Sequence, residues 1–322
     1  MRYLIGGLGS VGRRHLRNLV ALGETDVVLL RTGKSTLPAE DLAAFPVEHD
    51  LRAALARRPD AVIVSNPTAL HLSIAIPAAE AGCHLLLEKP LSDSMDGLDD
   101  LRRAIERGGG RTLVGFQFRH HPTLRRAKAL LDEGMLGRIL SVRAHWGEHL
   151  PDWHPWEDYR ESYAARRDLG GGVLRTLCHP FDYLRWMFGE VEEARGVVGE
   201  GLGLDVEVAA EIGLRFQSGL LAAVHLDYLQ APAEHSLSIV GDRGRLRWDA
   251  ITGDLEAGSH SFPVPEGFGR DQLFLAEMKH FIDVVRGESA SACTLEDGIR
   301  VQEILEAIAS SARLPRLDRS RS

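Results

Sequence analysis

The first twelve residues constrain the fold of this chain more than any other stretch. A short apolar run, Arg2 to Ile5, predicts a strand, and the glycines that follow it fall on a G-x-G-x-x-G spacing: Gly7, Gly9 and Gly12. Helical spacing of apolar residues begins directly after them. Strand, glycine turn and helix in this order are typical of a dinucleotide-binding site, although glycine turns also occur for structural reasons alone.

Each of these glycines has a separate structural role. Gly7 allows the tight turn, Gly9 lets the backbone approach a diphosphate, and Gly12 lets the helix pack close to its strand. The helix would start at Val11, and the unpaired N–H groups there and at Ser10, with the positive end of the helix dipole, would face the phosphates. We therefore expect this segment to bind a dinucleotide coenzyme.

The residues after the second predicted strand select between coenzymes. That strand is Val27 to Leu30, and NAD enzymes usually place Asp or Glu just after it, where it binds the ribose 2′-hydroxyl. This chain has Arg31 and Thr32 there. A cation with a hydroxyl suits a 2′-phosphate, and a guanidinium can also stack on the adenine. A solvated basic loop is the alternative, and we favour NADP over NAD.

Length, charge and cysteine content exclude several classes of protein. A chain of 322 residues suggests two domains, and its net charge of −8 argues against a nucleic acid or an anionic membrane as the main partner. No apolar run approaches the ~18–20 residues of a membrane span. The three cysteines form neither a disulfide framework nor a metal-ligand spacing, so we expect a cytoplasmic protein.

The first third of the chain alternates predicted strands with predicted helices. Continuous apolar runs are typical of buried parallel strands, and repeated strand–helix units predict a doubly wound parallel sheet, an α/β fold. The further strands expected are Ala61 to Ser65, His84 to Leu87 and Thr112 to Phe116, with helices at His71 to Gly82 and Asp96 to Gly108. Ligands bind beyond the carboxyl ends of such strands.

Two polar segments follow strands at that edge: Asn66-Pro67-Thr68 with His71 behind it, and Glu88-Lys89-Pro90. A charged pair directly after a buried strand is costly unless it is used. Pro90 restricts Lys89 to an extended backbone. Its ammonium group could then point into a cleft, where it could hydrogen-bond a substrate hydroxyl and stabilise a developing alkoxide. An ion pair with Glu88 at the domain rim fits the spacing equally well.

The pattern changes after about residue 120. Strand-like segments joined by short turns dominate there, which predicts a large, mainly antiparallel sheet in a second, α+β domain. The strands expected are Ile139 to Trp146, Glu193 to Val198, Val206 to Phe216, Gly219 to Tyr228, Ser236 to Val240 and Arg245 to Asp249. The helices expected are Pro122 to Glu133, Gly172 to Phe188, Asp271 to Arg286 and Thr294 to Ser311.

Several motifs together resemble one family, the glucose–fructose oxidoreductase, inositol dehydrogenase and rhizopine-catabolism (Gfo/Idh/MocA) oxidoreductases. The resemblance covers essentially the whole chain, and the Glu-Lys-Pro motif is specific in this context. The matching residues are Gly7 to Gly12 followed by Arg14-His15, Asn66-Pro-Thr with His71, Glu88-Lys89-Pro90, Gly115 to Arg119, Gly134 to Gly137, and Gly170-Gly171 with His179 and Asp182.

The resemblance implies an N-terminal Rossmann domain, residues 1–118, and a C-terminal substrate-binding domain, residues 119–322. The large open sheet of the second domain often forms the oligomer interface in this family, so a homodimer or homotetramer is expected. The implied chemistry is NAD(P)-linked oxidation or reduction at a hydroxyl or carbonyl of a sugar, cyclitol or nucleotide-sugar. The Asn66-Pro67-Thr68 segment, His71, Glu88 and Lys89 are then expected at the coenzyme.

The resemblance also makes His179 the candidate proton carrier. A histidine titrates near neutrality and can take a proton as hydride leaves a secondary alcohol, while Lys89 would position and polarise the oxygen. Asp182 lies three residues further on, so it shares a helix face with His179 and could contact it or the substrate. A satisfied core histidine is the structural alternative.

Two residues depart from the family pattern. The family commonly has an aspartate four residues before the histidine, and this chain has Arg175 there. Arg175 would lower the pKa of His179 if close, and it could bind an anionic group of the substrate. Pro180 would remove a helical hydrogen bond and clash with the carbonyl of Thr176, which predicts a kink or a break.

The segment from Trp146 to Tyr163 is rich in aromatic residues and histidines. Its rings could stack on a sugar as a substrate lid, with Trp156, Tyr159 and Tyr163 as binding residues, or simply pack in an interface. Arg119, at the domain junction, could also face the substrate. No acidic or cysteine partner is spaced with the histidines of this segment, so we expect no metal: His145, His149 and His154.

Two other functions are compatible with the same motifs. A glycosidase or epimerase could retain its NAD and recycle the hydride internally, turning over without added coenzyme. A non-catalytic sensor could bind the dinucleotide without reacting, which the change to Arg175 makes conceivable. We expect an oxidoreductase.

Overall fold

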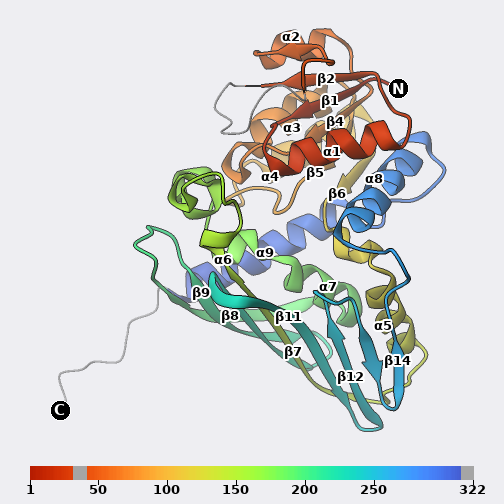
Figure 1. The fold of residues 1–322 in the computed structure, drawn as a ribbon, viewed down its shortest axis with the longest axis vertical. Helices are drawn as coiled ribbons and strands as arrows, with labels where there is room; N and C mark the ends of the chain where they lie inside the picture. The colour runs from red at the N-terminus through yellow and green to blue at the C-terminus, as the bar shows by residue number, and fades with distance from the viewer. Residues whose placement is uncertain (32–41, 313–322) are drawn as a thin grey trace.

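The computed structural model describes residues 1–31 and 42–312 of the chain. Two sheets dominate it, a parallel one in the N-terminal half and a larger one in the C-terminal half, with helices between them (Figure 1). None of the described helices is long and apolar enough to cross a membrane.

The N-terminal sheet is the doubly wound sheet that the sequence predicts. All its strand pairs are parallel, in the order β3-β2-β1-β4-β5-β6. The strand order reverses between β1 and β4, where a crevice for a ligand forms in such folds. Its strands are β1 (Tyr3–Gly6), β2 (Val27–Leu30), β3 (Val47–Glu48), β4 (Ala61–Val64), β5 (His84–Leu87) and β6 (Thr112–Val114).

Four helices belong to this sheet, of which the sequence pattern predicts three. They are α1 (Ser10–Ala21), α2 (Leu51–Ala56), α3 (His71–Glu80) and α4 (Leu98–Gly108). The pattern misses α2 and the two-residue strand β3, which are too short to show a period. The central strands β1, β2 and β4 are buried along their whole length, as their unbroken apolar sequence requires.

The C-terminal sheet has eight strands in the order β14-β13-β12-β11-β7-β10-β9-β8. Every pair is antiparallel except β7 with β10, so the mainly antiparallel sheet is confirmed. The strands are β7 (Ile139–His149), β8 (Val191–Gly199), β9 (Ala209–Phe216), β10 (Leu221–Asp227), β11 (Leu229–Gly241), β12 (Gly244–Asp249), β13 (Leu255–Ala257) and β14 (His260–Phe262). The last two, of three residues each, are absent from the prediction.

Helices cover one face of this sheet and leave the other face open (Figure 1). They are α5 (Pro122–Asp132), α6 (Val173–Thr176), α7 (His179–Phe188) and α9 (Leu295–Ser311). A further helix, α8 (Arg270–Arg286), packs against the N-terminal half. Strand β9 shows the consequence, because its residues alternate between buried and exposed. The predicted helix from Gly172 to Phe188 is broken into α6 and α7, as Pro180 predicts.

The C-terminal helices also pack against the N-terminal half. Helix α8 contacts α1, and both α8 and α9 contact β6. The backbone N–H of Val114 in β6 donates to the carbonyl of Cys293 at 3.0 Å, and Arg286 lies 2.6 Å from the buried carboxylate of Glu24. The division at residue 118 remains a prediction, and the end of the chain contributes to the packing of both halves.

Candidate active site

The glycine turn between β1 and α1 has the geometry that each glycine predicts. Gly7 has a φ of +97°, in the region that favours glycine, and a Cβ on it would lie 2.3 Å from the backbone nitrogen of Asn66. A Cβ on Gly12 would lie 1.9 Å from the carbonyl oxygen of Gly7. Gly9 has open space where its side chain would be, which is what the close approach of a diphosphate needs.

The start of α1 is free to bind an anion. Gly9 is the N-cap residue and has no side chain to cap the helix, and the first turn carries no acidic residue. Its first N–H groups, on Ser10, Val11 and Gly12, therefore have no helical acceptor. With the helix dipole, they fit the phosphates of a dinucleotide.

The proposed 2′-phosphate site is only partly described. Arg31 is half-buried at the end of β2, and its backbone is held by Glu48 and His49: its N–H donates to the carbonyl of Glu48, and its own carbonyl lies 2.9 Å from Nδ1 of His49. Its guanidinium makes no ion pair among the residues described. Thr32 lies outside the described residues. The choice between NADP and NAD therefore stays a prediction.

The loop after β4 is fastened to the loop after β5 through one histidine. His71 is buried, and its two ring nitrogens lie 2.9 Å from the carbonyl oxygen of Asn66 and 3.0 Å from that of Pro90. Burial lowers the pKa of His71. His71 thus holds both coenzyme-side loops in place, and its expected contact with the coenzyme stays a prediction, as do those of Pro67 and of the buried Thr68.

Glu88 is held by an ion pair that crosses to the first helix. His15 of α1 places Nε2 2.8 Å from Oε1 of Glu88, and both side chains are buried. Burial would raise the pKa of Glu88, but its hydrogen bond to His15 lowers it below the ordinary value. The expected pairing with Lys89 at the rim is limited to a 3.3 Å contact from the Lys89 backbone N–H, so the ammonium group is directed elsewhere.

Lys89 points to the break between α6 and α7. Its Nζ donates to the carbonyl oxygen of Thr176 at 2.7 Å. In an unbroken helix that carbonyl would accept from the N–H of residue 180, and Pro180 has none. Burial alone would lower the pKa of Lys89, but its acidic neighbours, with Cys178 and Tyr163 the largest, raise it above the ordinary value. Lys89 is therefore charged at neutral pH.

His179 begins α7 in an aromatic pocket. The rings of Phe118 and Trp146 lie 5.0 and 5.6 Å from its own, and its Nδ1 is buried without a hydrogen-bond partner. Burial, followed by the charge of Lys89, lowers the pKa of His179 well below 6.5. The imidazole is therefore neutral at physiological pH and can accept a proton.

Asp182 does not serve His179 as the sequence suggests it could. Arg119 grips its carboxylate through Nε and Nη2, with the shortest contact at 2.7 Å, and both side chains are almost fully buried. Arg119 also donates to the carbonyl of Ala292 at 2.6 Å and contacts Asp297 at 3.3 Å. These polar groups are satisfied by one another, and they join α7 to the start of α9.

Arg175 is also directed away from the histidine. Its guanidinium donates through Nε and Nη2 to the backbone carbonyl of Asp93, at 3.1 and 2.8 Å. After burial, the residues that lower the pKa of His179 are Lys89, His235 and Arg270. Arg175 is not among them, so it is not close enough to act on the imidazole, and its expected contact with the substrate stays a prediction.

Of the three aromatic residues expected to bind the substrate, Tyr163 lies beside Lys89, and the roles of Trp156 and Tyr159 stay predictions. Tyr163 is close enough to Lys89 for each to affect the pKa of the other; burial raises that of Tyr163. Trp156 is 55% exposed and stacks on His154, and Tyr159 contacts Arg160 and the carbonyl of Leu202. After β7 the segment is a loop of short turns, which fits the predicted lid in its local structure.

One buried carboxyl group in this region, that of Glu277, is not predicted by the sequence. Glu277 of α8 is 1% exposed, its Oε2 has no hydrogen-bond partner, and its carboxyl oxygens approach His15 and Glu88. Burial and the charge of Glu88 raise the pKa of Glu277 well above the ordinary value, which favours the protonated carboxyl group. A lone glutamate in an amphipathic helix carries no sequence signal of this role.

A second group from the C-terminal half approaches His179 from the sheet. His235 of β11 stacks on Trp146 at 3.9 Å between ring centres, and its Nε2 lies 3.0 Å from a carboxylate oxygen of Glu148. His235 and Arg270 both lower the pKa of His179. Trp146 and His235 lie far apart in the sequence, and the pairing of β7 with β11 places them opposite each other.

Comparisons with known proteins agree with this arrangement. The family described as "Oxidoreductase family, NAD-binding Rossmann fold" matches residues 1–116, and the "GFO/IDH/MocA C-terminal domain" matches residues 124–247. Together the two cover most of the chain.

Individual relatives match the chain to different extents. Myo-inositol 2-dehydrogenase of Thermotoga maritima is 28% identical over 92% of both chains. Levoglucosan dehydrogenase of Pseudarthrobacter phenanthrenivorans is 33% identical over 42% of this chain. The match spans only 35% of that relative's own length. A solved levoglucosan dehydrogenase in complex with NADH and levoglucosan has a TM-score of 0.85, at 21% identity and 97% coverage of both chains, which shows a shared fold. The glycine turn, the Glu-Lys-Pro loop and the matches to both domains make this chain a member of the Gfo/Idh/MocA family of oxidoreductases.

Proposed function

We propose that this protein is an NAD(P)-dependent oxidoreductase that moves a hydride between the nicotinamide and a hydroxyl or carbonyl carbon of a sugar, cyclitol or nucleotide-sugar. One observation carries the proposal: Lys89 and His179 lie at the same break between α6 and α7, one charged and one neutral, beside the coenzyme-side loops. The lysine reaches this place from the N-terminal half and the histidine from the C-terminal half.

The two side chains divide the work of alcohol oxidation. The coenzyme, when bound on the glycine turn and α1, supplies the hydride acceptor. Neutral His179 takes the hydroxyl proton through a ring nitrogen, and the ammonium group of Lys89 stabilises the negative charge that develops on the oxygen. In the direction of reduction, the same groups polarise the carbonyl and return the proton. Tyr163, beside Lys89, is positioned to contact the substrate.

Arg31 supports a preference for NADP within this proposal. Its guanidinium stands where an acidic residue would hold a 2′-hydroxyl, and it makes no ion pair among the residues described. A phosphate dianion would supply that partner. The solved relative in complex with NADH makes NAD the necessary comparison in any titration.

The named relatives support the substrate class. Levoglucosan dehydrogenase and myo-inositol 2-dehydrogenase act, by their names, on an anhydrosugar and a cyclitol. We infer a polyhydroxylated ring as substrate for this chain also. Assembly through the open face of the C-terminal sheet is part of the same proposal, and exposed Val197 and Leu221 on that sheet support it.

The test is coenzyme-linked turnover on a panel of sugars, cyclitols and nucleotide-sugars, followed by the absorbance of the reduced nicotinamide. We expect His179→Gln to lower kcat by about 10²–10⁴-fold and Lys89→Met by about 10²–10³-fold, with coenzyme affinity almost unchanged. His260→Gln and Lys279→Met, at exposed positions, serve as matched controls.

Three outcomes would replace the proposal. Turnover without exchange of free coenzyme, with nucleotide co-purifying, would indicate internal recycling of the hydride. Tight coenzyme binding with no turnover on any substrate would indicate a sensor. Full activity in both variants would remove Lys89 and His179 from the chemistry.

A further inference from the structure

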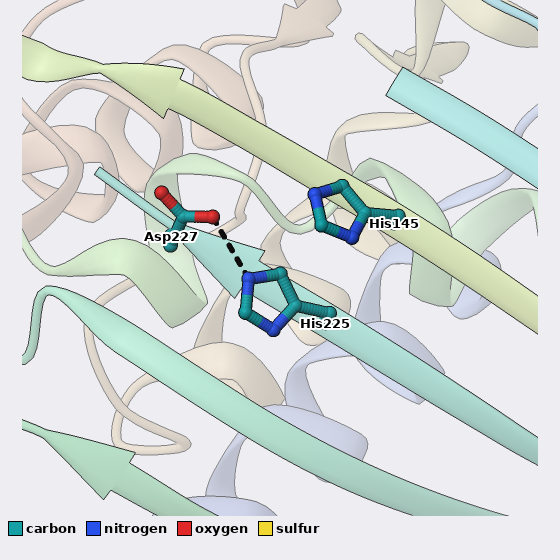
Figure 2. Close-up of side chains that lie close together, drawn as sticks. All are labelled: His145, His225 and Asp227. Carbon is teal, nitrogen blue, oxygen red and sulfur yellow. Dashed lines mark hydrogen bonds and ion pairs between the residues drawn. The ribbon is translucent and has the colours of Figure 1, made fainter. Parts of the chain in front are cut away.

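The open face of the C-terminal sheet carries a cluster of metal-ligating side chains, directly behind the candidate active site. Side chains alternate along a strand, so β7 points Trp146 toward His179 and points His145 to the opposite face. The neighbouring strand β10 pairs with β7 in register and places His225 and Asp227 on that same open face. Figure 2 shows the three side chains gathered across the two strands.

The donor atoms of this cluster approach one another closely. Nε2 of His225 lies 2.8 Å from Oδ2 of Asp227, and the rings of His145 and His225 stack at 4.5 Å between centres. One ligand atom from each of the three residues falls within 4.8 Å of the other two. A fourth donor is present, because Oε1 of Gln230 lies 2.6 Å from Nε2 of His145.

A glycine makes room for this convergence. Gly147 lies opposite Asp227 in the pairing of β7 with β10. A Cβ on Gly147 would lie 2.3 Å from Oε1 of Gln230 and 2.7 Å from Oδ2 of Asp227. Both oxygens thus occupy the space above the backbone that any other residue would fill.

The ligand residues are held by further hydrogen bonds. Glu211 of β9 places Oε1 2.6 Å from Nδ1 of His225, the carboxylate–histidine arrangement that orients metal ligands and leaves Nε2 for the ion. The backbone N–H of Leu229 donates to Oδ1 of Asp227 at 2.7 Å, which fixes the carboxylate and leaves Oδ2 directed at the histidines.

We propose that His145, His225 and Asp227, assisted by the amide oxygen of Gln230, form a binding site for a borderline divalent transition-metal ion such as Zn²⁺. Zn–N and Zn–O bonds are about 2.0–2.2 Å long, which puts tetrahedral donors roughly 3.4 Å apart. The two imidazoles must therefore turn inward when the ion binds and leave their stacked arrangement. The site would clamp β7 to β10, the one parallel pair in this sheet.

The surrounding charge favours an anion close to the bound ion. His145, His225 and Glu211 line a hollow with a volume of about 390 Å³, which is also lined by Arg143, Arg245 and Arg247. Among the described residues, no ion pair neutralises these three cations. Asp227 and Glu211 offset part of the positive charge, and an anion in the hollow beside the four donors would neutralise more of it.

Sequence spacing could not reveal this site. The expectation of no metal compared His145 with its neighbours His149 and His154, and the structure pairs those with Asp152 and Glu157 instead. The true partners of His145 come from a strand some eighty residues away.

The test is calorimetric titration of Zn²⁺ into the full-length protein after treatment with a chelator. We expect one ion per chain, and a loss of affinity of about 100-fold or more in His145→Gln, His225→Gln and Asp227→Asn. Glu211→Gln should weaken binding by about 10–100-fold. His260→Gln, which removes an exposed histidine on β14, is the matched control and should bind like the unaltered chain.

Titration with Co²⁺ gives a second readout that does not depend on calorimetry. Intense visible absorption indicates four-coordinate Co²⁺, and this absorption should be absent in His225→Gln. Circular dichroism of the metal-free variants shows that they fold. Zn²⁺ binding of equal affinity in folded His145→Gln and His225→Gln, or no binding above the background of the control, would overturn the proposal. Neither readout depends on the proposed oxidoreductase activity.

Discussion

The candidate site has a coenzyme side and a substrate side, here called its two walls, and the two use different chemical groups for binding. On the coenzyme side the backbone does most of the binding: a glycine turn, free N–H groups at the start of α1, and loops held from behind by His71 and His15. On the substrate side the side chains of Lys89, His179 and Tyr163 meet at a broken helix. Backbone sites tolerate few side chains near them, whereas side-chain sites depend on exact partners.

The largest expected effect is the loss of coenzyme affinity when a methyl group is added to the glycine turn. Gly12→Ala puts a Cβ 1.9 Å from the Gly7 carbonyl oxygen, so the turn must move and coenzyme affinity should fall by about 100-fold or more. Gly9→Ala is the matched variant, since nothing lies within 4 Å of its Cβ. Gly9→Ala should fold normally and weaken only the binding of the coenzyme. Fluorescence titration with NADPH measures the affinity of both variants. Normal binding by Gly12→Ala would show that the turn tolerates a side chain, contrary to the contrast drawn between the two walls.

The next effect separates the coenzymes on that same wall. Arg31→Ala should weaken NADPH binding by about 10–100-fold, as expected for the loss of a charge-assisted contact to phosphate, and leave NADH binding nearly unchanged. Arg58→Ala, at an exposed arginine of the same half, is the control. Equal weakening of both coenzymes would place Arg31 on the adenine instead of the 2′-phosphate.

A smaller effect is expected from the proline on the substrate wall. Pro180→Ala supplies an N–H that competes with Lys89 for the carbonyl of Thr176, so kcat should fall by about three- to tenfold while coenzyme affinity stays constant. Pro122→Ala makes the same change in the first turn of α5, away from the site. Steady-state kinetics of Pro180→Ala and Pro122→Ala provide the test. An equal fall in kcat in the two variants would show that losing any such proline has this effect, and would contradict a specific role for Pro180.

The smallest effect on catalysis is expected at Glu277, beside His15 and Glu88. Because burial favours the protonated form of Glu277, Glu277→Gln supplies a neutral group of similar shape, and kcat/KM should stay within about twofold. Glu277→Ala leaves a void beside His15 and Glu88, so it should lower the melting temperature. A Gln variant as damaged as the Ala variant would show that the carboxyl is ionised.

The sequence predicted best what is decided locally. The glycine turn and the break at Pro180 each depend on residues within a few positions of one another. The doubly wound sheet and the mainly antiparallel sheet follow from the periodicity of apolar residues in the same way.

The sequence could not predict contacts between distant elements. Arg119 and Asp182 were each assigned to the substrate or the chemistry, and the structure pairs them in the interior. The parallel pairing of β7 with β10 depends on strand order and not on the residues of either strand. The role of Glu277 depends on α8 returning to the N-terminal half.

That return of the chain has a consequence for biosynthesis. The backbone N–H of Val114 in β6 donates to the carbonyl of Cys293, two residues before α9, and Gly298 lets that helix approach Val114 so closely that an added Cβ would lie 3.2 Å away. Residues 1–114 are therefore synthesised well before the segment that covers one side of their own core. During synthesis this part of the core keeps apolar surface exposed until α9 has been made.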